Sequence, residues 1–108
     1  MDDRYSRQIL LPEIGLTGQE TLQQKKVVIV GIGALGTAAA ELLARTGVGN
    51  LCLIDRDVVE LNNLHRQILF EESDVGKSKA VAAKEKLTRI NSSIRITAEP
   101  IHLNLENI

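Results

Sequence analysis

The sequence predicts an α/β fold with a parallel sheet, and three observations lead to this prediction. Three short runs rich in strand formers, at 27–30, 51–54 and 93–99, alternate with two longer stretches of helical periodicity, at 34–46 and 75–90. A glycine-rich turn joins the first strand to the first helix. Because one helix connects each pair of strands, we expect parallel strands with right-handed crossovers. About three parallel strands with crossover helices make the amino-terminal half of a Rossmann-like, doubly wound sheet.

Length and composition indicate one ordinary globular domain. The 108 residues are 44% hydrophobic and 25% charged, and the net charge of −1 disfavours a nucleic-acid or anionic-membrane surface. No apolar run approaches the roughly 20 residues that span a membrane. The residues after Met1 are acidic and then basic, unlike a secretory signal, so we expect a cytoplasmic protein. The single cysteine, Cys52, is expected to be a small core residue, and it leaves no basis for a disulfide framework or a cysteine metal cluster.

Residues 1–25 are predicted to form a helical arm that precedes the sheet. Thr17 and Glu20 have the spacing of a capping box, which predicts a short helix over about 18–24. Arg4, near the start of this arm, is expected to be a solvated charge.

The turn after the first strand has the residue types of a phosphate-binding loop. Gly31 permits a tight turn, Gly33 lets a ligand approach the backbone, and Gly36 lets the helix pack closely on the strand. The helix then presents its free N–H groups and the positive end of its dipole to an anion. Asp55 follows Gly36 by 19 residues, close to the spacing at which an acid after the second strand binds a ribose. These residues predict a nucleotide site at the carboxyl edge of the sheet.

Periodicity also predicts which residues face the core and where the helices end. The helix at 34–46 is expected to bury an apolar stripe made of Leu35, Ala38, Ala39, Leu42 and Leu43. Gly47 is expected to end this helix in a left-handed conformation. The helix at 75–90 closes at Asn91, and residues 103–108 are predicted to begin another helix.

Basic residues are predicted to gather at the same edge as the glycine turn. A polar loop leaves the second strand there and carries Arg66. Lys77 and Lys79 are placed in the first turn of the helix at 75–90, where cations oppose the helix dipole and therefore hint at an anionic ligand. Arg66 and Lys79, with Arg7 as a third candidate, suit a triphosphate better than the two charges of a pyrophosphate.

Each of these side chains also has an ordinary interpretation. Taken singly, Arg66 and Lys79 are more often solvated surface residues, as is Arg7. His65 is more often a surface or packing residue than a catalytic base, and Asp57 either assists a metal ion or caps a turn. The pattern as a whole, rather than any one residue, supports the nucleotide site.

Five segments in this order and spacing resemble the amino-terminal half of the ThiF/MoeB/HesA family, relatives of the ubiquitin-activating enzymes. They read RYSRQILLPEIG, VVIVGIGALGT, GVGNLCLIDRDVVELNNLHRQILF, DVGKSKA and LTRIN. The most specific parts are the initial Arg-Tyr-Ser-Arg-Gln and the Asn-Leu-x-Arg-Gln loop at 63–67, which dehydrogenases lack. The resemblance implies binding of ATP with Mg²⁺ and adenylylation of the carboxy-terminal Gly-Gly of a ubiquitin-like protein. In the ThiF and MoeB branches that protein is a sulfur carrier for thiamine or molybdopterin synthesis.

The resemblance also implies roles for individual residues. Asp55 would hold the ribose, and Arg7 matches an arginine that reaches the phosphates of a neighbouring subunit, which implies a homodimer. The candidate cofactor-binding residues are Gly31, Gly33, Ala34, Gly36, Asp55, Asn62, Asn63, Arg66 and Lys79, and the candidate catalytic residues are Arg7, Arg66 and Lys79. No metal ligand is predicted among them.

The chain departs from the family pattern in two ways, and two other functions stay open. Ala34 stands where many relatives have another glycine, which narrows the room near the phosphates. The family's downstream aspartate for Mg²⁺, its paired-cysteine zinc site and its carrier-binding surface have no counterpart in residues 1–108. We therefore expect a truncated nucleotide-binding part that is inactive alone, with zinc only in the missing part. The alternatives are an NAD-binding oxidoreductase domain and a non-catalytic nucleotide-binding subunit.

Overall fold

Three strands form one parallel sheet in the order β1-β2-β3. The computed structural model describes residues 3–104 and 106, and its strands are β1 (Lys26–Val30), β2 (Asn50–Ile54) and β3 (Arg95–Glu99). The predicted strands are thus confirmed. β3 begins two residues later than predicted because Ser93 donates its N–H to the Asn91 side chain, at 3.0 Å, in the preceding turn.

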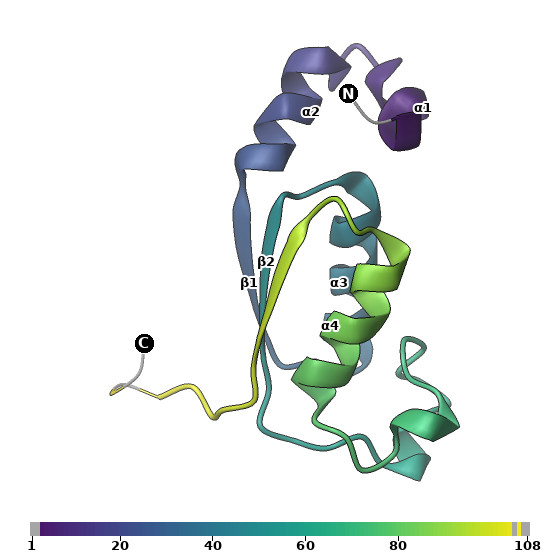
Figure 1. Cartoon of the computed structure of the whole chain (residues 1–108), viewed down its shortest axis with the longest axis vertical. Helices are drawn as coiled ribbons and strands as arrows, with labels where there is room; N and C mark the ends of the chain where they lie inside the picture. Colours follow the sequence, from purple (N-terminus) through teal and green to yellow (C-terminus); the bar gives the residue numbers. More distant parts are fainter. Residues whose placement is uncertain (1–2, 105, 107–108) are drawn as a thin grey trace.

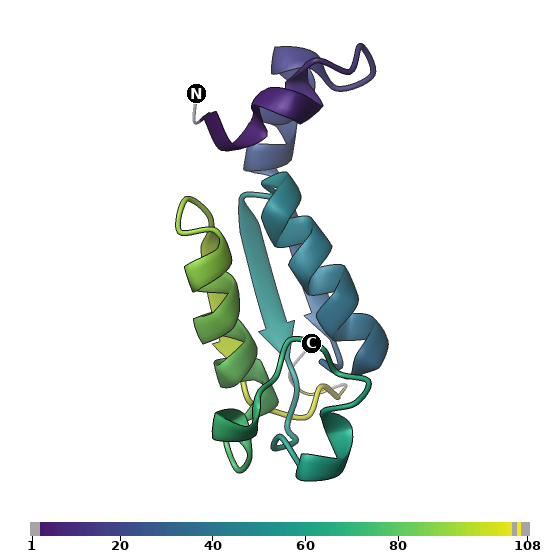
Figure 2. The ribbon, with the colours of Figure 1, turned by 90° about the vertical axis from the view of Figure 1, so that its right-hand side faces the viewer.

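Both long helices cover one face of this sheet. α3 (Ala34–Thr46) and α4 (Lys79–Ile90) lie side by side on the same side of the strands, as Figure 1 and Figure 2 show. Leu51 and Leu53 of β2 are buried beneath them together with Leu87 of α4. Two right-handed crossovers that advance in the same direction across a sheet place both helices on one face. No helix among residues 3–104 and 106 has the length and apolar character needed to cross a membrane.

The opposite face of the sheet has no helix of the described chain upon it. Val28 and Val30 of β1 point to this side and are 51% and 58% exposed. Cys52, which pairs in register with Val28, is only half-buried. Cys52 is therefore more exposed than we predicted, since we expected it to be a core residue.

The predicted buried stripe of α3 is wrong at Leu35 and Leu42, whereas Leu43 packs against the core. Leu35 and Leu42 are 85% and 64% exposed, and the fully buried positions of this helix are Thr37, Ala40 and Ala44. Small side chains on the inner face let the helix lie close to the strands and to α4. Because α3 is apolar around most of its circumference, hydrophobic periodicity alone did not distinguish its inner face.

The amino-terminal arm contains α1 (Ser6–Ile9), preceded by a 3₁₀ turn at Asp3–Tyr5, and α2 (Gly15–Gln24). The predicted capping box is wrong because α2 begins three residues before Gly18, so that Thr17 lies inside the helix. The N-cap position is Ile14, which has no side-chain hydrogen bond to the helix.

The arm packs on the carboxyl ends of the two long helices. Gln8 and Gln19 donate to the Thr46 carbonyl at 2.7 and 3.1 Å, and Arg4 donates to the Ile90 carbonyl at 2.9 Å. These last-turn carbonyls have no partner within their own helices, and a cation is favoured at the negative end of the dipole. Arg4 is thus a helix-capping residue rather than the purely solvated charge that we predicted.

A buried polar contact joins the arm to both helices. The Asn91 side chain donates to the Tyr5 hydroxyl and to the Ala44 carbonyl, both at 2.8 Å. Gly47 ends α3 at φ 93°, as predicted. A side chain there would come within 2.7 Å of Tyr5, so the turn needs glycine for space as well as for backbone conformation.

The helix predicted at 75–90 begins at Lys79 instead, after two 3₁₀ turns at Leu61–Asn63 (η2) and Glu72–Asp74 (η3). Gly76 has φ 90° and its N–H donates to the Val59 carbonyl, which draws residues 76–79 away from a helical path. Lys77 therefore lies outside the first turn of α4, contrary to our prediction. The helix predicted at 103–108 is not observed at residues 103 and 104, and residues 105, 107 and 108 lie outside the described part.

An ion-pair cluster joins η3 to α4 and gives a pH-dependent prediction. Lys86 donates to Glu71 and lies 3.4 Å from the carboxylate of buried Asp74. The bond to Glu71 raises the pKa of Lys86 above its ordinary value, partial burial opposes the rise, and Asp74 adds to it. A raised native pKa stabilises the fold below the unfolded pKa of about 10.4, and this stabilisation is lost as pH rises through the native pKa.

We therefore expect Lys86→Met to melt at a lower temperature than the parent chain at pH 7 to 9, with the difference closing as pH rises through the raised native pKa of Lys86. Thermal denaturation across this pH range measures the effect. Lys84→Met, an exposed lysine on the same helix, serves as the matched control and should show no such pH-dependent gap. A constant deficit for Lys86→Met at every pH would mean that its packing, not its charge, stabilises the fold.

Candidate nucleotide-binding site

The glycine turn lies at the carboxyl ends of β1 and β2, as predicted. Gly31 has φ 90°, and its N–H donates to the Ile54 carbonyl at 2.8 Å. A side chain on Gly36 would lie 2.0 Å from the Gly31 carbonyl oxygen, so α3 starts close against the turn only because Gly36 has none. Space around Gly33 is open, since a Cβ built there meets nothing within 4 Å. The turn thus has the close helix packing and the accessible backbone of a phosphate-binding loop.

Asp55 is held directly against this turn. One carboxylate oxygen accepts the Ile32 N–H at 2.7 Å, and the other accepts the Asp57 N–H at 2.7 Å. The two bonds link the glycine turn to the loop that follows β2. Each carboxylate oxygen has a second lone pair, which leaves Asp55 able to accept hydrogen bonds from a pair of ligand hydroxyls.

Two adjoining hollows open at this edge. The first, of about 180 Å³, is lined by Val30, Gly31, Ile54, Asp55, Arg56, Asp57, Ile101, His102 and Leu103. The second, of about 460 Å³, is lined by Arg56, Asp57, Val58, Glu60, Asn63 and Lys79. Because Arg56 and Asp57 line both, a single extended ligand can lie across the two.

Lys79 gives the second hollow its positive charge. The residue is only 8% exposed, and among residues 3–104 and 106 its ammonium group has no hydrogen-bond or ion-pair partner. Its backbone N–H donates to the Asp57 carbonyl at 2.9 Å, which fixes the first residue of α4 against the loop after β2. The ammonium group is not among the buried polar atoms that lack a partner, so it keeps contact with the hollow, where its point charge suits an anionic ligand.

The paired asparagines of the loop have a local structural role. The Asn63 side chain accepts the Glu60 N–H at 3.1 Å and donates to the Asn62 side chain at 3.2 Å. Asn63 is buried and lines the second hollow, whereas Asn62 is exposed and lines neither. Of this predicted pair, the structure brings only Asn63 to the site.

The two predicted arginines lie elsewhere. Arg66 and its neighbour His65 are both exposed, and neither residue lines a hollow of the site. Arg7 is exposed in α1, at the end of the molecule opposite the glycine turn (Figure 1). Ala34 is the exposed first residue of α3, immediately after Gly33. Arg7 and Arg66 therefore do not join Lys79 at the site within one chain.

The sequence did not single out Arg56, which lines both hollows, or Glu60 in the second. Arg56 could have been predicted from the sequence, because it directly follows Asp55 at the carboxyl end of the second strand, where ligands of such sheets bind. Asp57, which we left open as a metal ligand or turn cap, also lines both hollows. Among the described residues, no group of three or more histidine, cysteine or acidic side chains is arranged to hold a metal ion.

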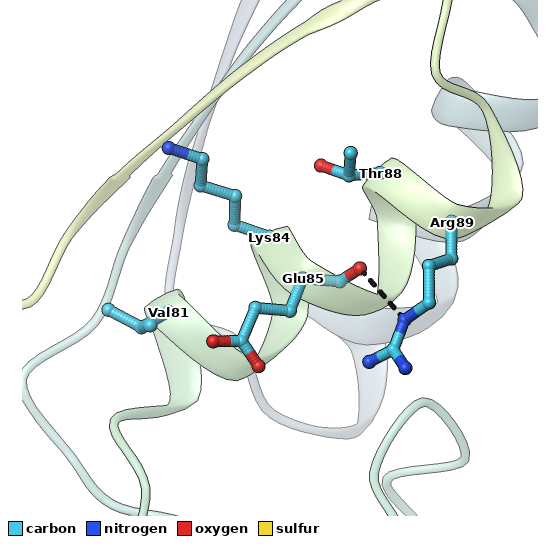
Figure 3. A pocket seen from close by; sticks show the side chains of 5 residues that line it. All are labelled: Val81, Lys84, Glu85, Thr88 and Arg89. Atoms are coloured by element: carbon cyan, nitrogen blue, oxygen red, sulfur yellow. Dashed lines mark hydrogen bonds between the residues drawn. The ribbon is translucent and has the colours of Figure 1, made fainter.

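A separate hollow of about 590 Å³ runs along the outer side of α4. Figure 3 shows its lining side chains, Val81, Lys84, Glu85, Thr88 and Arg89, all from this one helix. The Arg89 guanidinium donates to the Glu85 carbonyl at 3.4 Å. None of these residues belongs to the glycine turn or to the loop after β2, so this hollow is distinct from the candidate site.

Comparisons with known proteins find relatives that match nearly the whole chain. The Sulfur carrier protein ThiS adenylyltransferase of Bacillus subtilis is 49% identical over 110 residues, covering 100% of this chain and 33% of the relative. The Molybdopterin-synthase adenylyltransferase of Escherichia coli is 48% identical over 104 residues, covering 96% of this chain and 41% of the relative. The chain thus spans less than half the length of these relatives.

Solved structures give the same result for the fold. Escherichia coli MccB crystallised with ATP superposes with a TM-score of 0.87 at 39% identity, over 96% of this chain and 32% of MccB. The Rossmann-like assignment is confirmed by this likeness together with the three parallel strands. The model of the ThiF family matches residues 5–108, and the chain therefore belongs to the ThiF family.

Proposed function

We propose that this chain supplies the ATP site of an enzyme that adenylylates the carboxy-terminal glycine of a ubiquitin-like sulfur-carrier protein. The observation that carries the proposal is the mostly enclosed Lys79 side chain, which has no ion-pair partner among the described residues and lines a hollow that adjoins Asp55 and the glycine turn. Asp55, which would accept hydrogen bonds from the ribose, and Lys79, which would bind the phosphates, thereby line two adjoining hollows. The names of two relatives, Sulfur carrier protein ThiS adenylyltransferase and Molybdopterin-synthase adenylyltransferase, support the carrier as the acceptor.

The chemistry requires charge stabilisation more than covalent participation by the protein. A carboxylate oxygen of the carrier attacks the α-phosphorus, the bond from that phosphorus to the bridging oxygen breaks, and pyrophosphate leaves with the bonding electrons. In this proposal, Lys79 and the N–H groups of the glycine turn stabilise the negative charge on the phosphates. Asp55 positions the nucleotide through its ribose.

Mg²⁺ fits the residues at this edge. The ion binds one or two carboxylates together with substrate phosphates, and the exposed Asp57 carboxylate lines both hollows. Bound there, the ion would neutralise phosphate charge. A zinc site is proposed only for a carboxyl-terminal part like that of longer relatives.

The proposed enzyme is a homodimer in which Arg7 and Arg66 complete the charge around the phosphates. Arg7 belongs to α1, which lies at the end of the molecule opposite the glycine turn (Figure 1), so in this proposal it serves the site of a partner chain. A cytoplasmic location stays a prediction. The two alternatives, an NAD-binding oxidoreductase domain and a non-catalytic subunit, are outcomes of the following test.

In the full-length protein with Mg²⁺, we expect ATP–pyrophosphate exchange that requires a carrier ending in Gly-Gly. Asp55→Ala should reduce this exchange by about tenfold or more, because it removes the charge-assisted hydrogen bonds to the ribose. Exchange of labelled pyrophosphate into ATP measures the reaction, and a carrier that lacks its last glycine is the control.

Thermal shifts with ATP and with NAD separate the alternatives. A ligand at 100 times its Kd adds about 2.7 kcal/mol of stability, which shifts the midpoint by on the order of ten degrees. A shift with NAD larger than that with ATP would support the oxidoreductase. Binding of ATP without carrier-dependent exchange would support the non-catalytic subunit, and either result contradicts the proposed enzyme.

A further inference from the structure

We propose that Asp74, a buried residue outside both hollows, is a positioning residue for the Lys79 ammonium group. Asp74 is 1% exposed, lies at the end of η3, and belongs neither to the glycine turn nor to the lining of either hollow. The inference deepens the proposed function and rests on it, because it concerns how the same site holds the phosphates of ATP.

Asp74 first organises the turn that precedes α4. One of its carboxylate oxygens accepts the Glu71 N–H at 2.8 Å, and its backbone carbonyl accepts the Lys77 N–H at 2.9 Å. These two bonds close η3 and start the next turn, in which Gly76 has a left-handed backbone conformation. The path from residue 74 to residue 77 is therefore fixed by Asp74 at both ends.

Asp74 also fastens this turn to the helix that carries Lys79. Its carboxylate lies 3.4 Å from the Lys86 ammonium and 3.8 Å from that of Lys77. Lys86 follows Lys79 by seven residues, which is two helical turns, so both lysines project from one side of α4. The Asp74 carboxylate therefore contacts the same side of α4 from which Lys79 projects.

The fixed turn then pairs with the loop after β2. Gly76 donates to the Val59 carbonyl and Val59 donates to the Lys77 carbonyl, both at 2.8 Å, and Val58 and Ser78 form an antiparallel bridge. The last bond of this pairing joins the Lys79 N–H to the Asp57 carbonyl. The backbone of Lys79 is therefore held at the second hollow by a continuous set of bonds that begins at Asp74.

This arrangement places the effect of Asp74 on the phosphates rather than on the nucleoside. Lys79 lines the second hollow, whereas Asp55 lines the first, where the Ile32 N–H of the glycine turn donates to its carboxylate independently of Asp74. Loss of the Asp74 carboxylate should displace the Lys79 ammonium and leave Asp55 in place. If Asp74 only stabilised the fold, its loss would weaken the binding of ATP and of adenosine equally.

The test compares ATP with adenosine by calorimetry on the full-length protein and its variants. We expect Asp74→Ala to weaken ATP binding about tenfold, the scale of one charge-assisted hydrogen bond, and to leave adenosine binding unchanged. Asp74→Asn keeps an oxygen for the Glu71 N–H but loses the ion pairs, so its effect on ATP should be smaller. Glu72→Ala, an exposed acid in the same turn, is the matched control and should change neither ligand.

A double-mutant cycle identifies the residue through which Asp74 acts. In a Lys79→Met background, Asp74→Ala should have no further effect on ATP binding, because the group that it positions is already absent. An undiminished effect in that background, or equal weakening of ATP and adenosine, overturns the proposal. Wild-type protein that binds no ATP would instead reject the proposed function itself.

Hydrogen exchange gives a second readout that does not depend on the alanine variant folding well. In Asp74→Asn, the amides of Val59, Gly76 and Lys79 should exchange faster than in the parent protein, while those of Leu51 and Leu53 in β2 keep their protection. Unchanged exchange at all five amides would mean that the carboxylate does not hold this pairing, and would overturn the proposal.

Discussion

Gly36→Ala is expected to destabilise the fold by about 3 kcal/mol or more, although alanine is normally the better helix former by about 1 kcal/mol. The added methyl would lie 2.0 Å from the Gly31 carbonyl oxygen, a backbone atom that cannot rotate away. Relief requires α3 to move off the strand, which opens the core beneath it. For a chain of this size, the loss corresponds to a fall in melting temperature of about 15 °C. Thermal or urea denaturation measures it.

Gly33→Ala is the matched control for this substitution. A methyl at Gly33 meets nothing within 4 Å, and the φ of −95° is accessible to any residue. The fold should therefore lose less than about 1 kcal/mol. If Gly36→Ala were as stable as Gly33→Ala, the close contact between α3 and the glycine turn would not exist in solution.

Lys79→Met is expected to reduce ATP affinity by roughly 10- to 100-fold while keeping or raising the melting temperature. The two effects differ because the ammonium group has no ion-pair partner among the described residues of the free protein, whereas it faces phosphate in the proposed complex. Methionine retains the length of the side chain and removes its charge. Calorimetric titration with ATP and thermal denaturation without ligand measure the two effects separately.

Lys84→Met, on the exposed side of the same helix, provides the comparison for charge alone. It should alter neither ATP affinity nor melting temperature appreciably, since surface charges contribute little. A large drop in stability for Lys79→Met would show that the lysine has a structural partner. Equal ATP affinities for Lys79→Met and Lys84→Met would contradict the binding of phosphate by Lys79.

Local patterns were sufficient to predict the elements whose conformation is decided nearby. The glycine turn, the bounds of α3 and its left-handed end at Gly47 all follow from residues that are adjacent in the chain. The meeting of Asp55 with that turn was also predictable, because parallel strands bring their carboxyl ends to one edge.

The errors arose where distant segments decide the outcome. The start of α4 depends on pairing between residues 57–59 and 76–79, which helical periodicity does not record. This same pairing distinguishes Lys79, which enters the hollow, from Lys77, which binds Asp74 instead. The buried face of α3 depends on what packs against it, since leucines and alanines occur on several of its sides.

The parallel register has a consequence for how quickly the chain can fold. Lys26 pairs with Asn50, 24 positions later, whereas Asn50 pairs with Arg95, 45 positions later. The entropic cost of loop closure rises with the length of the intervening chain, so the β1–α3–β2 unit is favoured as the folding nucleus and β3 docks afterwards. Substitutions in that unit should mainly slow refolding, whereas those in β3 should mainly accelerate unfolding.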